Sequence, residues 1–169
     1  MKILVTLDGS HFSESILATV ARIAAPLSAE VELLAVGRPE QAQATPAHER
    51  SVEMAPVATA TGVRLAVPAP ADLLAPAAES RAQAVGRLET SLRDYLASRA
   101  RELPGVRVEA RVELSDDPGA AIVARARDTH PDLIAMATHG RTGISHLLAG
   151  SVCETVIRSG VAPVLVLRP

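Results

Sequence analysis

Apolar residues follow two alternating spacings along this chain of 169 residues. Short apolar runs, typical of strands, are separated by segments whose apolar residues recur every three or four positions, as on the buried face of a helix. The runs predict five strands, at residues 3–7, 31–36, 106–114, 133–137 and 161–167. The helical spacing predicts four helices, at residues 16–27, 85–103, 118–126 and 150–160.

Residues that favour helix ends support these boundaries. Ser10 or Ser13 is predicted to cap the first helix, and Asp117 is predicted to cap the third. Ser151 and Glu154 have the spacing of a capping box at the start of the fourth helix. In such a box the hydroxyl bonds an amide of the first helical turn, and the carboxylate reaches back to the cap amide.

The alternation of strands and helices predicts an α/β fold with one parallel sheet and helices on both faces. The third strand alternates charged and apolar residues, so one of its faces is expected to be exposed. The fifth strand carries Pro163, which cannot donate to a central ladder. Both strands therefore belong at edges, and a doubly wound five-stranded sheet of order 3-2-1-4-5 meets these demands. Its switch point lies between the first and fourth strands, at their carboxyl ends, where such folds bind ligands.

The length of the chain predicts one domain over residues 1–169. From about residue 37 to residue 77 the chain is rich in Ala and Pro without sustained periodicity. This stretch predicts a long variable loop, with at most a short strand at residues 63–67. Loops of this length are usually functional or disordered, which leaves two alternatives, a lid over the crevice or a disordered insertion.

A glycine-rich segment follows the fourth strand, at the predicted switch point. Residues 136–143 have the sequence MATHGRTG, and Gly150 precedes the fourth helix. The free amides and the dipole of a helix N-terminus favour an anion, so we interpret this segment as a phosphate cradle. Arg141 is either a phosphate partner or a solvated loop charge. The segment has no Walker A lysine, which excludes a P-loop.

Composition removes several classes of partner. Aromatic residues make up 1% of the chain, which leaves little to stack on bases, and the net charge of −2 gives no basic footprint. No nucleic-acid or membrane partner is therefore expected. Cys153 is the single cysteine, so no internal disulfide is possible, and no segment has the length of a signal-peptide core or a membrane span. We expect a cytoplasmic protein.

Other groups with chemical potential favour structural roles. His139 and His146 have no carboxylate or cysteine at ligand spacing, so no metal site is expected. Asp116 lies beside the predicted cap Asp117, and the pair is interpreted as helix capping rather than as paired catalytic carboxylates. Cys153 is interpreted as a packed thiol. No residue set suggests a nucleophile and base, so no catalytic residue is predicted.

Five segments resemble the universal stress protein family. They are ILVTLDGS at 3–10, LLAV at 33–36, DLIAMATHGR at 132–141, LLAGSV at 147–152 and APVLV at 162–166. The resemblance implies a Rossmann-like, adenine nucleotide alpha hydrolase-like domain that binds ATP, with Mg²⁺ held by the phosphates. The ATP-binding branch of the family carries three spaced motif glycines followed by serine or threonine. Gly140, Gly150 and Ser151 match the last three elements, and Ala137 replaces the first glycine.

The resemblance and the predicted crevice together give a set of nucleotide contacts. Asp8 stands where the family contacts adenosine, although it is alternatively a helix-starting residue without a ligand. Val36 would offer its backbone to the adenine edge. The full predicted set is Thr6, Leu7, Asp8, Val36, Ala137, Thr138, His139, Gly140, Arg141, Thr142, Gly143, Gly150, Ser151 and Val152.

These inferences predict an ATP-binding regulatory module of the stress response that senses or sequesters nucleotide, with at most slow ATP hydrolysis. Two alternatives stay open. One is a nucleotide-free dimeric interaction module, which Ala137 favours, and the other is a slow adenylyl- or phosphoryl-transfer enzyme. The apolar fifth strand, from Val161 to Leu167, has an open edge and predicts a homodimer, as the family resemblance also implies.

Overall fold

The computed structural model describes residues 1–42, 54–58, 64–68, 80–138 and 151–168. The chain forms two compact units. The main unit comprises Met1–Ala42 with Val85–Pro169, and the second comprises Gln43–Ala84. None of the helices among the described residues is long and apolar enough to cross a bilayer.

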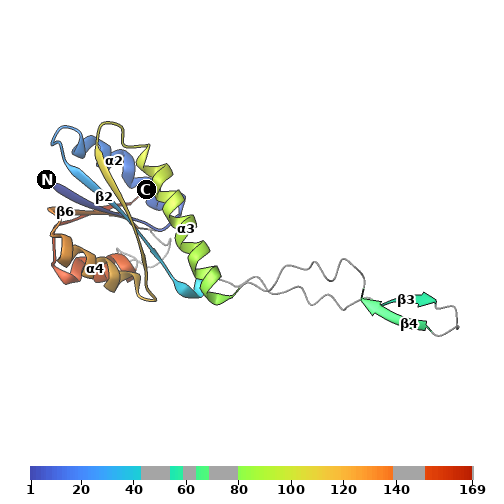
Figure 1. Ribbon diagram of the computed structural model, residues 1–169. Coiled ribbons are helices and arrows are strands. Elements are labelled where there is room, and N and C mark those ends of the chain that lie inside the picture. Colours follow the sequence, from blue (N-terminus) through green and yellow to red (C-terminus); the bar gives the residue numbers. More distant parts are fainter. Residues whose placement is uncertain (43–53, 59–63, 69–79, 139–150, 169) are drawn as a thin grey trace. The chain divides into compact units, whose positions relative to one another are not determined.

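The main unit is built on a five-stranded parallel sheet of order β5-β2-β1-β6-β7 (Figure 1). Its strands are β1 (Lys2–Leu7), β2 (Glu30–Gly37), β5 (Arg107–Leu114), β6 (Leu133–Ala137) and β7 (Val164–Leu167). In chain order this is 3-2-1-4-5, so the predicted fold class and strand order are confirmed. The sheet order reverses between β1 and β6, which is the predicted switch point.

Helices cover both faces of this sheet (Figure 1). They are α1 (His11–Glu14), α2 (Ile16–Ala24), α3 (Arg81–Ala100), α4 (Pro118–Thr129) and α5 (Ser151–Ser159). One apolar cluster joins α2 and α3 to the strand residues that include Ile3 and Val5. A second cluster joins α4 and α5 to the opposite face, through residues such as Leu4 and Ile134. The two periodicities in the sequence thus give a doubly wound sandwich.

Helix ends agree with the sequence at two of the predicted caps. The Ser10 hydroxyl accepts a hydrogen bond from the Ser13 N–H at 3.2 Å, and the Asp117 carboxylate accepts one from the Ala120 N–H at 3.0 Å. The predicted first helix, residues 16–27, corresponds to α2, which ends earlier, at Ala24, and the short helix α1 lies between the Ser10 cap and Ser15. The Ser15 hydroxyl and amide both donate to the Phe12 carbonyl, which closes a tight turn and separates the two helices.

The fifth strand is shorter than predicted. It begins at Val164 rather than at Val161. Pro163 has no N–H, so only its carbonyl takes part in the ladder, where it accepts from the Ile134 N–H at 2.9 Å. The regular pairing with β6 therefore starts one residue later, with Ile134 opposite Val164.

The second unit contains strands within the segment predicted as a loop. β3 (Met54–Ala58) and β4 (Arg64–Pro68) form a two-stranded antiparallel sheet. The start of the predicted loop, a 3₁₀ turn at Pro39–Gln41 after β2, belongs to the main unit. β4 matches the predicted short strand at 63–67 to within one residue, whereas β3 was not predicted. Both strands contain proline, which weakens the sequence signal for a strand.

Candidate functional site

The carboxyl ends of three adjacent strands meet at one edge of the main sheet. β1 ends at Leu7, β2 at Gly37 and β6 at Ala137. The parallel registers place Leu7 beside Ala35 of β2 and Val5 beside Ala135 of β6. Residues that directly follow β1 and β6 therefore lie on either side of the switch point, where α/β sheets form their ligand crevice.

Asp8 is the first residue beyond β1, and its side chain is exposed. Its Oδ1 atom accepts hydrogen bonds from the Ser10 N–H at 2.9 Å and from the Ser10 hydroxyl at 2.6 Å. Gly9 between them has φ of +81°, a left-handed conformation that glycine adopts without a steric penalty. These interactions fix the orientation of the carboxylate at the mouth of the switch point.

Ser13 secures the same turn from below. Its buried hydroxyl accepts a hydrogen bond from the Asp8 N–H at 3.2 Å and donates one to the Ser10 carbonyl at 2.9 Å. The sequence predicted Ser10 or Ser13 as the cap of the first helix, whereas in the structure the two serines form different hydrogen bonds. Ser10 caps α1 and orients the carboxylate, whereas Ser13 anchors the backbone of Asp8.

Ala137 and Thr138 form the opposite side of the switch point. Ala137 ends β6 opposite Leu167, and the Thr138 N–H donates to the Leu167 carbonyl at 3.0 Å. Thr138 is buried and Ala137 is half-buried. Among the described residues other than glycine, only Ser28 and His130 have positive φ, so Ala137 has no backbone conformation that would require glycine.

Val36 lies at the end of β2, half-buried and opposite Glu113 of β5. Gly37 follows it, and sequence reasoning gave this glycine no role beyond the start of a loop. A Cβ at Gly37 would lie 2.8 Å from the Leu92 side chain and 3.0 Å from the Leu114 side chain. The glycine thus lets α3 pack closely against the end of the strand that carries Val36.

Helix α5 returns from β6 to the parallel strand β7, so its N-terminus lies at the carboxyl edge of the sheet. Ser151 is exposed as the first residue of the helix, and Val152 is half-buried. The Glu154 side chain does not form the predicted capping box with Ser151. Glu154 forms an ion pair with Arg158, at 2.8 Å, because the two side chains are one helical turn apart.

The described residues bring part of the predicted site together. Thr6, Leu7, Asp8, Val36, Ala137 and Thr138 share the carboxyl edge of adjacent strands. His139, Gly140, Arg141, Thr142, Gly143 and Gly150 lie outside the described residues. The phosphate cradle and the nucleotide contacts therefore stay predictions, whereas the adjacent strand ends that would line the crevice are observed.

Buried ionisable groups lie elsewhere in the main unit. Burial raises the pKa of Glu32, but hydrogen bonds and charges from Arg125 and Lys2 outweigh it, so the pKa of this carboxyl is lowered. Burial also raises the pKa of the Cys153 thiol, which favours the protonated form and agrees with a packed cysteine. Within the described ranges, no three His, Cys, Asp or Glu side chains gather as metal ligands would.

Comparison with known proteins gives a consistent set of matches. The model of the universal stress protein family matches residues 1–168. The universal stress protein MJ0531 of Methanocaldococcus jannaschii is 41% identical over 64 residues, which cover 38% of this chain and 37% of that relative. In this match the chain thus spans little more than a third of the relative's length.

Solved structures match over nearly the whole chain. The structure of MJ0577, another universal stress protein of Methanocaldococcus jannaschii, has a TM-score of 0.67 and 25% identity, and the match covers 99% of this chain and 95% of that one. A universal stress protein in complex with cAMP has a TM-score of 0.60 and 19% identity, with 99% and 96% covered.

Proposed function

The chain belongs to the universal stress protein family, and on this basis we propose that it is a regulatory module of the stress response that binds an adenine nucleotide, with ATP as the ligand. One observation carries the proposal. Asp8 and the Ala137–Thr138 segment flank the switch point of the sheet, where ligands of doubly wound folds bind. The structural neighbour in complex with cAMP supports an adenine nucleotide as the class of ligand.

Different residues would contact different parts of the nucleotide. The Asp8 carboxylate would contact the ribose or the base, because Ser10 already holds it in one orientation. The backbone of Val36 would offer an N–H and a C=O to the adenine edge. The N-terminus of α5, with Ser151 and Val152, and the glycine-rich segment before it would bind the phosphates, which in turn would hold Mg²⁺.

The conformation of Ala137 is compatible with this ligand. The family motif has glycine at this position, but the extended backbone observed here is open to any residue. The replacement therefore imposes no backbone strain on the crevice.

A regulatory role fits the chemistry better than a role as an enzyme. ATP hydrolysis requires a group that orients or activates water, and the sequence suggests no nucleophile paired with a base and no water-activating carboxylate at the phosphate end of the proposed site. We therefore expect at most slow hydrolysis. We further propose that the module acts in the cytoplasm as a homodimer, paired through the outer edge of β7, the last strand of the sheet.

Calorimetric titration with ATP and Mg²⁺ tests the proposal. The wild-type protein should bind ATP, and Asp8→Ala should weaken binding about tenfold or more, because it removes an oriented charged hydrogen-bond partner. Asp128→Ala is the matched control. It also removes an exposed carboxylate, but at the C-terminal end of α4, outside the proposed set of nucleotide contacts. Absence of heat with wild-type protein at millimolar ATP would reject the proposal, and equal effects of both substitutions would reject the role of Asp8.

The replacement of glycine by Ala137 favours a second candidate, a nucleotide-free interaction module. Ala137→Gly separates the two functions. If the family ligand has been lost through this methyl group, the glycine variant gains affinity for ATP by an order of magnitude or more. Under the leading proposal the wild-type protein already binds ATP, and the variant changes the affinity only slightly.

A further inference from the structure

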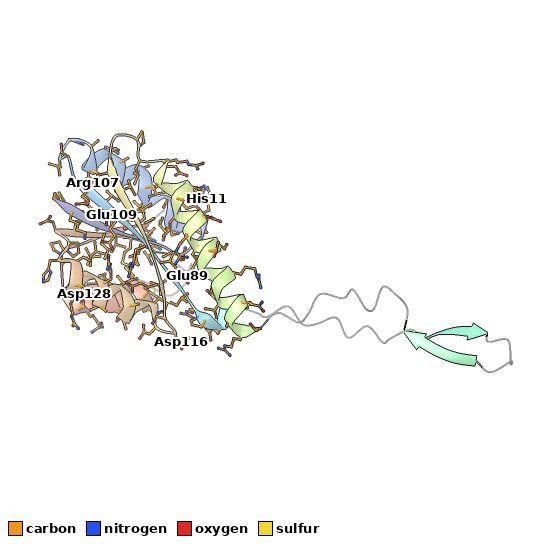
Figure 2. The ribbon with its side chains drawn as sticks, in the orientation of Figure 1. His11, Glu89, Arg107, Glu109, Asp116 and Asp128 are labelled. Carbon is orange, nitrogen blue, oxygen red and sulfur yellow. The ribbon has the colours of Figure 1, made fainter. Side chains whose placement is uncertain are left out.

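The β5 strand forms one edge of the main sheet and pairs with β2 on a single side. Its side chains carry the regular alternation of charged and apolar residues that predicts an edge strand. Arg107, Glu109, Arg111 and Glu113 occupy alternate positions along one face of the strand. Figure 2 labels two of them, Arg107 and Glu109, on this edge.

The central charges of this face have no partner of their own. Glu109 and Arg111 are exposed, and neither forms an ion pair or hydrogen bond within the part of the chain that the structure describes. Arg107 is held only loosely, with 3.6 Å to Glu30 and 78% of its side chain exposed. Ala110, on the alternate face, is exposed as well. As far as the described residues show, the strand thus presents an unpaired backbone edge together with charges of both signs that have no partner.

The charge sequence is complementary to itself when it is reversed. If two copies of β5 pair antiparallel about Ala110, Glu109 lies opposite Arg111 of the second copy. Arg107 then lies opposite Glu113, and Val108 opposite Val112. We propose that β5 is a self-association surface, on which a second copy of this chain adds its own β5 strand to the sheet edge through a two-fold axis at Ala110.

The charge pattern selects this register over its neighbours. Sliding one strand by two residues in either direction places Arg opposite Arg and Glu opposite Glu. Like charges directly opposite each other destabilise a strand pair, whereas opposite charges stabilise it. Pairing about Ala110 therefore places every charged side chain of the strand opposite a charge of the other sign. Because the axis is two-fold, each cross-strand ion pair occurs twice.

This contact is independent of the nucleotide and of the proposed dimer at β7. β5 and β7 are the two opposite edges of the sheet, so occupation of one leaves the other open. Charged side chains commonly protect edge strands from nonspecific pairing. The β5 pattern would do so while permitting one specific partner, an identical strand in one register.

Charge reversal tests the pairing with the full-length chain in sedimentation equilibrium at low salt. Glu109→Arg and Arg111→Glu should each weaken the β5-dependent association about tenfold or more, because each places like charges opposite each other twice. The double variant E109R/R111E should restore association close to the wild-type level, and a mixture of the two single variants should associate across the two chains. Both residues are exposed, so the variants should fold normally, and circular dichroism serves to check that they do. Identical behaviour of all four proteins, or failure of the double variant to recover, would overturn the proposal.

A disulfide across the proposed axis provides an independent test. In an antiparallel pair about Ala110, the two Ala110 Cα atoms would be roughly 4.5–5.5 Å apart, within the range of a disulfide. Ala110→Cys should therefore give a covalent dimer under mild oxidation, whereas Arg107→Cys, which would face Glu113 rather than itself, should not. The native Cys153 is buried, so the wild-type chain gives the background level of disulfide cross-linking. Equal cross-linking of both variants would contradict the register.

Discussion

The hydroxyl groups of two serines hold the turn that presents Asp8. Ser10 binds the carboxylate and Ser13 binds the backbone N–H, so the acidic side chain is oriented before any ligand arrives. The sequence identified Asp8 from its place at the end of a strand, but it left the two serines as alternatives. Both serines have a spacing suitable for a cap. Their different roles follow from the left-handed conformation of Gly9, which sets the direction of the chain between Asp8 and Ser10.

His130 provides a prediction at the scale of one residue. It ends α4 in the left-handed conformation, with φ of 45° and ψ of 58°, and its N–H donates to the Ala126 carbonyl. This conformation costs a residue with a Cβ about 1 kcal/mol relative to glycine. His130→Gly should therefore raise the free energy of unfolding by about 0.5–1 kcal/mol in urea titrations, since the side chain is exposed. His130→Ala keeps the Cβ and should show no such gain; a glycine variant less stable than the alanine variant would contradict the interpretation.

At the scale of elements, a buried ion pair network ties β1, β2 and α4 together. Glu32 lies within the apolar run of β2 and is 1% exposed. Its carboxylate pairs with Lys2 of β1 at 2.9 Å and with Arg125 of α4. The sequence predicted the strand but not this network, because Arg125 is 93 residues away along the chain. A glutamate inside an apolar run was the only local signal that such partners exist.

The network predicts a loss of stability in acid. The folded-state pKa of Glu32 is lowered from the ordinary value of 4.5, so its stabilising contribution is complete above about pH 4.5 and is lost as the pH falls through the lower folded-state pKa. Glu32→Gln should cost about 3 kcal/mol at neutral pH, because two cations lose their buried partner, and it should flatten the acid dependence.

Glu40→Gln is the control for this experiment. Glu40 also faces an arginine, Arg38 at 3.5 Å, but this pair is exposed, so its removal should change stability by less than about 0.5 kcal/mol. Urea unfolding between pH 3 and pH 7 measures both variants. An acid dependence that is unchanged in Glu32→Gln would assign the loss of stability to other carboxylates.

The ends of elements were harder to predict than their types. Alternation along β5 and Pro163 beside β7 gave the two edge strands, and the sheet order followed from them. The break between α1 and α2 could not be predicted, because the apolar spacing starts at Ile16 and does not report on residues 11–15, where the Ser15 hydroxyl bonds the Phe12 carbonyl. Likewise, Glu154 pairs with Arg158 and not with the cap residue Ser151. The sequence could not decide between them, because both lie at a suitable spacing from Glu154.

At the scale of the whole molecule, the doubly wound sheet defines the place of the proposed ligand site. Parallel strands bring the carboxyl ends of β1, β2 and β6 to one edge, and the strand order reverses beside Asp8, where doubly wound folds bind their ligands. This global feature followed from the sequence because it depends on a few strongly patterned strands. The second unit, Gln43–Ala84, has weak patterning and proline in both strands, so neither β3 nor its pairing was foreseen.

Amide chemical shifts during titration with ATP and Mg²⁺ test the central claim most directly, because they report binding and location together. If the nucleotide binds at the switch point, the largest shifts should occur at the carboxyl edge, for the amides of Leu7, Asp8, Val36 and Thr138. The amides of Ile3 and Asp132, at the amino ends of β1 and β6, should stay nearly unchanged. An unchanged spectrum at millimolar ATP, or shifts centred on another part of the molecule, would contradict a nucleotide site at this switch point.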